Sequence, residues 1–250
     1  MRTSRAQANR LRAIQLRMFL AGERTVSRRV APVMNSMMKA AATAAKKGRS
    51  TDAAIDKHTP MMRRILRAAY KPIQKQFGDL SHAMLGLKGL EPVELKQSAF
   101  EVELLLYTEE QSLAAATSIA ASSKSLVAGI ITAGEASGES VGTIASQIGK
   151  ATGLSPFRAA RVARTEVHSA AMHAGQTVAR STDLELIKIW LTTTDDRTRD
   201  THAGADLQEQ EMDDPYYVGG AALMFPGDPG GPAEEIINCR CGELYEEKEE

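Results

Sequence analysis

The sequence has few cysteines and few aromatic residues. Two of its 250 residues are cysteine, Cys239 and Cys241, and aromatic residues make up 4% of the chain. A disulfide between residues two positions apart closes a small, strained ring, so these cysteines do not form a structural framework. They are expected to be free thiols or metal ligands in a protein made in a reducing cytoplasm.

A long apolar run is also missing. No segment reaches the roughly 18 consecutive apolar residues of a membrane-spanning helix, and the longest candidate, Leu126 to Ala133, ends before Gly134. The apolar patch Met18 to Ala21 is too brief for a signal peptide and is followed by Glu23. The sequence therefore predicts neither a membrane span nor secretion.

The formal net charge of zero hides an uneven distribution of charge. Residues 1–75 contain 18 Lys and Arg against 3 Asp and Glu, whereas residues 76–250 contain 13 against 28. A basic segment of this kind favours an anionic partner, either nucleic acid or an acidic protein surface, and a merely solvated helical surface is the alternative. The candidate contact residues are Arg5, Arg10, Arg12, Arg17, Arg28, Arg29, Lys46, Lys47, Arg63 and Arg64.

Helical periodicity dominates the first half of the chain. Apolar residues at helical spacing predict a long amphipathic helix over 11–45 and a second from Pro60 to near Gly78. Residues 79–92 are interpreted as a connection, followed by a helix over 94–133 with a break near Ser122. This pattern predicts a basic amphipathic helical arm over 1–78 and a helical connector over 79–134.

The second half changes character. Residues 141–148 predict a short helix after Ser140, Ser155 followed by Pro156 predicts a helix to about Ser181, and the β-branched run 186–193 predicts a strand. The Pro- and Gly-rich segment 213–232 is predicted to lack regular structure, and a last strand over 240–245 is expected to pair with the Trp190 strand. The predicted fold class is α+β, with one domain over 135–250 that ends in an acidic tail.

The cysteine pair has the residue types of a soft-metal site. Tetrahedral zinc takes four ligands from thiolates and imidazoles, and Cys239, Cys241 and His202 are the best three in this chain. His168 is the expected fourth ligand, with His173 and Asp196 as substitutes. The predicted cofactor is a structural Zn²⁺ that ties strand, loop and helix together. In the alternative, the thiols are buried strand residues, His202 caps a turn and no metal binds.

Several motifs occur in a fixed order: Ala163-Arg164-Thr165-Glu166, a strand containing Trp190, Asp196-Arg197-Thr198-Arg199 before His202, Pro226-Gly227-Asp228, and Asn238-Cys239-Arg240-Cys241. Together they resemble the Mu F-like head-morphogenesis family of tailed phages. The resemblance covers about residues 135–245, whereas residues 1–130 carry no match.

The resemblance implies a minor, non-catalytic protein of the phage head, present in few copies and associated with the portal during assembly. Some members of the family bind packaged DNA, and metal binding has been suspected from their Cys and His residues. The implied partners are the portal, capsid or scaffolding proteins and double-stranded DNA. The implied location is the head interior or portal region of the virion, after assembly in the host cytoplasm, with a role in genome delivery.

The charged residues around His202 allow more than one interpretation. Planar guanidinium groups bridge carboxylates and carbonyls, so we predict a structural network of Arg164, Glu166, Asp196, Arg197 and Arg199, with phosphate contact as the alternative. A rival hypothesis is a metal-dependent nuclease or phosphodiesterase in which His202, Asp196, Asp200 and Glu166 hold a hard metal ion. A third is a nonspecific DNA-binding module driven by residues 1–75 alone.

Overall fold

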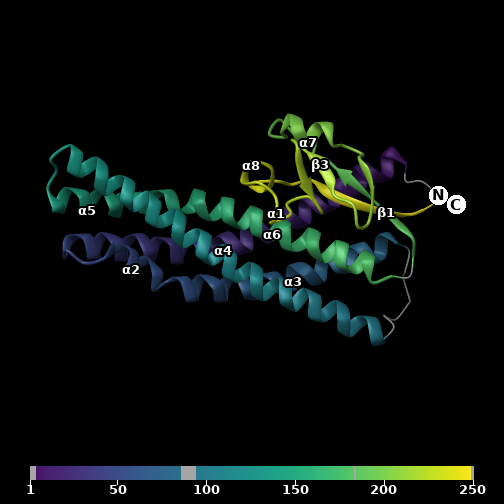
Figure 1. Ribbon diagram of the computed structural model, residues 1–250, viewed down its shortest axis with the longest axis horizontal. Coiled ribbons are helices and arrows are strands. Elements are labelled where there is room, and N and C mark those ends of the chain that lie inside the picture. Colours follow the sequence, from purple (N-terminus) through teal and green to yellow (C-terminus); the bar gives the residue numbers. More distant parts are fainter. Residues whose placement is uncertain (1–3, 86–93, 183, 249–250) are drawn as a thin grey trace. The chain divides into compact units, whose positions relative to one another are not determined.

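The computed structural model describes residues 4–85, 94–182 and 184–248. Helices dominate the chain (Figure 1): α1 Arg5–Lys46, α2 Thr51–Asp56, α3 Thr59–Met84, α4 Glu94–Ala136, α5 Val141–Lys150, the 3-10 turn η1 Ala151–Leu154, and α6 Ser155–Arg180. A smaller region with strands follows: β1 Leu186–Leu191, α7 Asp200–Gly204, β2 Glu209–Glu211, β3 Tyr216–Val218, β4 Ala221–Leu223, α8 Ala233–Ile236 and β5 Gly242–Glu247. This order confirms the predicted α+β class.

The central strand of the three-stranded sheet is β1, which lies between β2 and β5. Both pairings are antiparallel, and Trp190 pairs with Glu243 of β5, as expected from the sequence. Figure 1 shows the strands and the short helices gathered beside α6. Trp190 is fully buried and meets the Tyr216 ring edge-on, with centroids 5.2 Å apart. This aromatic pair anchors the core around the two cysteines.

Helix α3 runs past the predicted end at Gly78 and continues to Met84. A Cβ added at Gly78 would lie only 3.2 Å from the Val178 side chain, so the glycine permits close packing against α6. That packing outweighs the helix penalty of glycine, about 1 kcal/mol. Residues 79–84 of the predicted connection are therefore helical, and its remainder over 86–92 lies outside the described residues.

The predicted break in α4 near Ser122 is also wrong. The hydroxyls of Ser122 and Ser123 donate to the Ile119 carbonyl within the same helix, at 3.0 and 2.8 Å. Serine side chains that bond to the preceding turn are compatible with a continuous helix. Two adjacent serines in the sequence were therefore not sufficient evidence for the end of a helix.

The segment 213–232 contains regular structure, contrary to expectation. Strands β3 and β4 form a hairpin whose two turn residues, Gly219 and Gly220, have φ of +59° and +83°. Positive φ at both positions is what a two-residue turn of the primed type requires, and glycine supplies it without strain. The glycines that suggested irregular structure are the turn of a hairpin.

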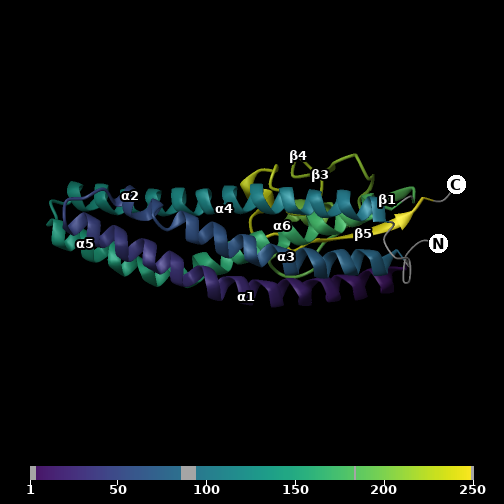
Figure 2. The same cartoon turned by 90° about the horizontal axis from the view of Figure 1, so that it is seen from below.

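Contacts divide the chain into two compact units. The first unit comprises residues 1–23, 70–108 and 164–250, and the second comprises 24–69 and 109–163. In the first unit, α1 and α3 lie side by side (Figure 2), and Phe19 stacks on Phe77 with ring centroids 4.9 Å apart. Each unit combines distant parts of the sequence, and the division at 78 and 134 stays a prediction.

Methionine and branched aliphatic side chains form the core of the second unit. The fully buried members include Val30, Met34, Met37, Met38, Met62 and Leu66. Length and composition alone would allow Phe100–Ala136 of α4 to cross a membrane, a criterion that core helices of soluble proteins also meet. The expectation that no segment spans a membrane stays a prediction.

Candidate metal centre

The short helix α7 places His202 in the core of the first unit. The side chain is 2% exposed, and the edge of its ring meets Trp190 with centroids 5.6 Å apart. The Thr192 hydroxyl donates to the His202 carbonyl at 2.5 Å and fixes α7 against the end of β1. The imidazole is therefore held in one place by the strand before it.

The two cysteines enter the same core through a tight turn after α8. Asn238 adopts a left-handed conformation with φ of +63°, which asparagine tolerates better than most residues. The Cys239 amide then donates to the Ile236 carbonyl at 3.2 Å. This reversal of the chain brings both thiols, each 2% exposed, next to His202.

The three potential ligand atoms lie within 4.8 Å of one another. His202 Nδ1 is 3.4 Å from Cys241 Sγ and 3.7 Å from Cys239 Sγ. On the other side of the ring, His202 Nε2 is 3.0 Å from the Glu235 carboxylate. Because an ionised carboxylate only accepts, this contact assigns the hydrogen to Nε2 and leaves the Nδ1 lone pair facing the thiols.

Glu235 is itself fixed by its neighbours. Its carboxylate accepts a hydrogen bond from the Thr201 hydroxyl at 3.0 Å, and the residue is only 7% exposed. A Cβ at Gly219 would lie 2.1 Å from its other oxygen, so the glycine of the β3–β4 turn leaves room for the carboxylate. The orientation of the His202 imidazole therefore depends on the buried Glu235 carboxylate, which its neighbours hold in place.

The thiols differ in acidity. A hydrogen bond from the Cys239 thiol lowers the pKa of Cys241 well below its usual value despite burial. Burial raises the pKa of Cys239, and the bond to Cys241 acts in the same direction. The Cys241 thiol is thus the more readily deprotonated of the two when a metal binds, and the Cys239 thiol donates a hydrogen bond to it.

The donor set fits a soft divalent metal. Two thiols and an imidazole whose far nitrogen is bound to a carboxylate match the ligand and supporting residues of zinc sites. The three potential ligands also border a hollow of about 20 Å³, which is large enough for one water molecule. The described residues thus offer three protein ligands and space for a fourth from solvent.

His168, the expected fourth ligand, lies outside this group. Its Nε2 donates to the Cys241 carbonyl at 2.6 Å, and its other nitrogen faces Gly227, where a Cβ would approach to 2.3 Å. Burial lowers the pKa of His168 to about 4, so the ring is neutral. His168 supports the cysteine turn through the backbone. The substitute candidate His173 stacks on Tyr107 with centroids 3.9 Å apart.

Part of the predicted charged network surrounds the cysteine turn. Arg164 of α6 donates to Glu23 at 3.2 Å and to the Asn238 side chain at 2.8 Å, and Arg199 donates to the Ile237 carbonyl. These guanidinium groups bind the residues just before Cys239. Arg197 is 66% exposed in its side chain and pairs with Asp195 at 3.4 Å.

The other members of the network lie elsewhere. Glu166 accepts a hydrogen bond from Tyr70, and the Asp196 side chain is 94% exposed, 4.0 Å from Arg197. Neither carboxylate belongs to the cluster at His202. The structure thus does not bring together the carboxylates of the proposed nuclease site in the part of the chain it describes.

Sequence reasoning missed two important residues. Glu235 orients His202, and Arg240, between the cysteines, pairs with Asp195 at 2.9 Å with only 10% of its side chain exposed. The position of Arg240 inside the Cys239–Cys241 motif was a usable signal. Glu235 carried none, because it is 33 residues from His202 and lies beside another glutamate.

The basic residues predicted to contact nucleic acid or the portal lie in different environments. Arg12 pairs with Asp206 at 2.5 Å, and Arg63 pairs with Glu109 at 3.1 Å. Arg12 keeps only 13% of its side chain exposed, so it is not available to a partner. The exposed members are Arg5, Arg10, Arg17, Arg28, Arg29, Lys46, Lys47 and Arg64.

Comparison with known proteins gives two similarities. The family model described as phage Mu protein F like protein matches residues 126–243. The chain is also 35% identical over 107 residues to the NAD(+)--arginine ADP-ribosyltransferase EFV of Enterococcus faecalis, which covers 42% of this chain and 22% of that protein. No solved structure matches.

The family match includes α6, the His202 helix and the cysteine turn. It begins inside α4 and ends in β5, close to the region where the order of motifs resembles the same family. Residues 126–243 of this chain therefore belong to the phage Mu protein F-like family.

Proposed function

We propose that this chain is a minor head protein of a tailed phage that acts in head morphogenesis and is carried in the virion. The observation that supports the proposal is the family match over residues 126–243, which contains the buried cluster of His202, Cys239 and Cys241. The chain covers about a fifth of the curated relative, so that protein's activity is not transferred.

Quantitative mass spectrometry of purified phage particles tests this role. A few copies per particle are expected, together with cross-links to the portal protein in assembling heads. Particles that assemble normally and lack the protein at every stage would disprove the role.

We propose further that the exposed basic residues of α1 contact the portal, with packaged DNA as the competing partner. Arg28 and Arg29 lie exposed on adjacent positions, in a segment that has few acidic residues to neutralise them. Charge directs the encounter, and the apolar positions of the helices supply affinity. A contribution to genome delivery would follow from the same contacts.

The two partners respond differently to salt and to mutation. Arg28→Glu with Arg29→Glu should weaken portal capture, and DNA binding should remain weak and fall steeply between low and physiological salt through counterion release. If the double variant loses tight DNA binding and still captures the portal normally, DNA and not the portal is the partner of these arginines. Glu110→Gln is a control at another exposed charged position.

For the metal cluster we propose a structural Zn²⁺ held by Cys239, Cys241 and His202, with water as the fourth ligand. The ion would connect α7 to the turn before β5 and neutralise the buried thiolates. Protein purified without a His-tag or added metal should contain about one zinc per chain by elemental analysis. A folded, metal-free protein with the same thermal stability would disprove the proposal.

We propose no catalytic activity for the chain. The Glu235 carboxylate binds the far nitrogen of His202, and the Glu166 carboxylate accepts a hydrogen bond from Tyr70. Incubation with plasmid DNA and Mg²⁺ or Mn²⁺ should give no cleavage, and incubation with NAD⁺ should give no transfer to arginine. Cleavage that is lost in His202→Ala would favour the nuclease hypothesis.

A further inference from the structure

The middle of α4 is exposed and almost without charge. Between residues 111 and 134 the one charged residue is Lys124, in a chain with 25% charged residues. Apart from Leu113, the exposed positions in this stretch are small, among them Ala114, Thr117 and Ala121. Small side chains let another helix approach closely, because the distance between packed helices is set by the residues at the contact.

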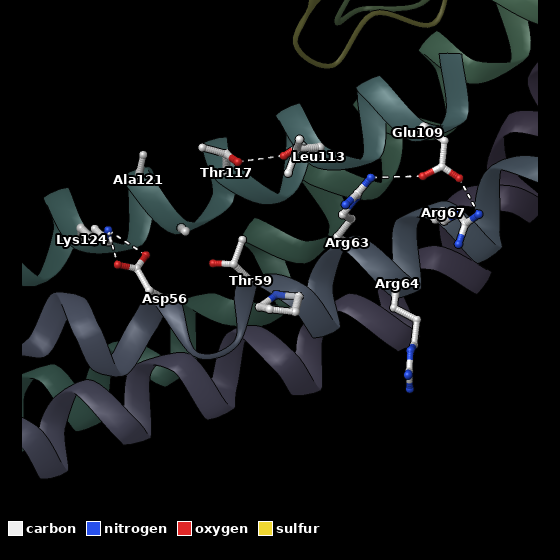
Figure 3. A pocket seen from close by; sticks show the side chains of 12 residues that line it. Asp56, Thr59, Arg63, Arg64, Arg67, Glu109, Leu113, Thr117, Ala121 and Lys124 are labelled. Atoms are coloured by element: carbon white, nitrogen blue, oxygen red, sulfur yellow. Dashed lines mark hydrogen bonds and ion pairs between the residues drawn. The ribbon is translucent and has the colours of Figure 1, made fainter. Parts of the chain in front are cut away.

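A groove of about 640 Å³ in the second unit follows this stretch between α3 and α4 (Figure 3). Leu113, Thr117 and Ala121 line it from α4, and Pro60 lines it from α3. Leu113 is 48% exposed there, which is high for a large aliphatic side chain. The groove thus has an apolar floor, open to solvent.

Ion pairs mark both ends of the groove. At one end Glu109 accepts from Arg63 at 3.1 Å and Arg67 at 2.5 Å, and at the other Asp56 pairs with Lys124 at 2.7 Å. Glu109 and Lys124 are 15 positions apart on one helix, which corresponds to about 22 Å, or four helical turns. The groove matches the length of a short helix.

The charge at the two ends differs. Asp56 and Lys124 balance each other, whereas Arg63 and Arg67 share the single carboxylate of Glu109. Arg64 is exposed beside them and points away from α4 in Figure 3. The α3 side of the groove therefore has an excess of positive charge that no described residue neutralises.

We propose that this groove binds an amphipathic α-helix of a partner protein, with its small or apolar face on α4 and acidic residues along α3. The apolar floor contributes to affinity only with a partner that has apolar side chains, which disfavours the DNA backbone. The unbalanced arginines favour an acidic partner over a second copy of the same basic surface. The inference rests on the proposed head-assembly role only for the source of the partner.

The test uses designed peptides and the full chain. One fluorescent helical peptide of about six turns has an Ala/Leu face flanked by Glu, and its twin has Lys at the flanking positions. The Glu peptide should bind with micromolar affinity and at least about tenfold more tightly than the twin, a difference of about 1.4 kcal/mol. Equal affinity, or no binding of either peptide up to about 1 mM, overturns the proposal.

Matched variants locate the contact. Thr117→Glu places a charge on the floor and should weaken the Glu peptide at least about tenfold, whereas Ser118→Glu, exposed one position away and outside the groove lining, should not. Arg64→Glu should weaken binding of the Glu peptide, and the control Lys150→Glu, at an exposed position of the same unit outside the groove lining, should not. Equal effects of the paired variants overturn the site, since nonspecific charge then explains binding.

Other occupants have their own signatures. Self-association that is lost in Thr117→Glu assigns the groove to a second copy, and displacement of the peptide by a short DNA duplex assigns it to nucleic acid. Either result overturns the proposal. If neither peptide binds, the groove proposal fails, but the protein can still be found in phage heads by mass spectrometry. The two proposals can therefore fail separately.

Discussion

The two units bury different kinds of residue. In the first unit the buried residues include ionisable side chains such as Glu23, Lys188, His202 and Glu243. In the described part of the second unit, the buried polar residues are Ser112, Ser123 and Ser155, and the other buried positions are apolar. The second unit keeps its charged residues near the surface, in the ion pairs of the α3–α4 groove.

This difference separates two ways of specifying structure. A buried ionisable group is stable only with the correct partners, so the first unit tolerates one arrangement of its polar atoms. Lys188, for example, donates to the Met224 carbonyl at 2.7 Å and lies over the Tyr216 ring. Apolar packing in the second unit constrains the volume of each buried side chain and does not require a specific polar partner.

The largest predicted effect comes from removing both thiols. In Cys239→Ser with Cys241→Ser we expect loss of bound zinc and of several kcal/mol of stability, which lowers Tm on the order of 10 °C. Hydrogen exchange should increase in β1, β5 and α7 and stay unchanged over residues 24–69. Elemental analysis, thermal unfolding and exchange mass spectrometry measure these changes.

A chelator provides the control for this variant. EDTA should lower the Tm of the wild-type protein and leave that of the double variant unchanged. Faster exchange over residues 24–69 as well would contradict the contrast between the units, since both would then depend on the metal cluster.

The second prediction compares two arginines. Arg164→Ala removes the ion pair of the buried Glu23 and the hydrogen bond to the half-buried Asn238 side chain, and should cost about 2 kcal/mol of unfolding free energy. Arg67→Ala removes a 57%-exposed side chain from Glu109, which keeps Arg63, and should cost less than about 1 kcal/mol. Chemical denaturation measures both unfolding free energies. Equal losses in the two variants would contradict the proposed difference between the buried ion pairs of the first unit and the exposed ones of the second.

The third prediction concerns pH. Burial lowers the pKa of His173 to about 4, and Arg180 acts in the same direction. The unfolded chain therefore binds a proton that the folded chain excludes, so stability is complete above pH 6.5 and decreases toward pH 4, by at most about 1.4 kcal/mol per pH unit. His173→Phe, which preserves the stacking on Tyr107, should show a shallower decrease in denaturation curves from pH 7 to 4.

The smallest effect is expected for Arg197→Ala. Its guanidinium is 66% exposed and its nearest carboxylate oxygen is 3.4 Å away, so the cost should stay below about 0.5 kcal/mol. Arg240→Ala, which exposes the buried side of the same carboxylate, should cost more. Similar Tm values for the two variants would show that the Asp195 pairs are equivalent.

Local signals predicted much of the fold. Ser155 before Pro156 located the start of α6, and the β-branched run after residue 185 located β1. These signals act within a few residues of the element they specify. The helical extension past Gly78 was not predictable, because it depends on Val178, 100 positions later. The hairpin at Gly219 was hidden by the density of glycine and proline around it.

The candidate site was predictable to a similar extent. Cys239, Cys241 and His202 are chemically distinctive and were selected by residue type, and the structure brings them together. Glu235 and Asp195 are ordinary acids in a chain with 31 of them, so only their position in space distinguishes them. His168 was selected for the expected packing of α6, and it does lie near the cysteine turn, bound to a carbonyl.

The place of β1 in the sheet has a consequence for folding in the cell. β1 lies between β2 and β5, and β5 is synthesised well after β1. Until Gly242–Glu247 leaves the ribosome, one edge of a strand that contains Trp190 and Leu191 has no partner. Unpaired apolar edges are prone to aggregation. The β1 edge that faces β5 therefore stays unpaired until the chain has been synthesised through Glu247.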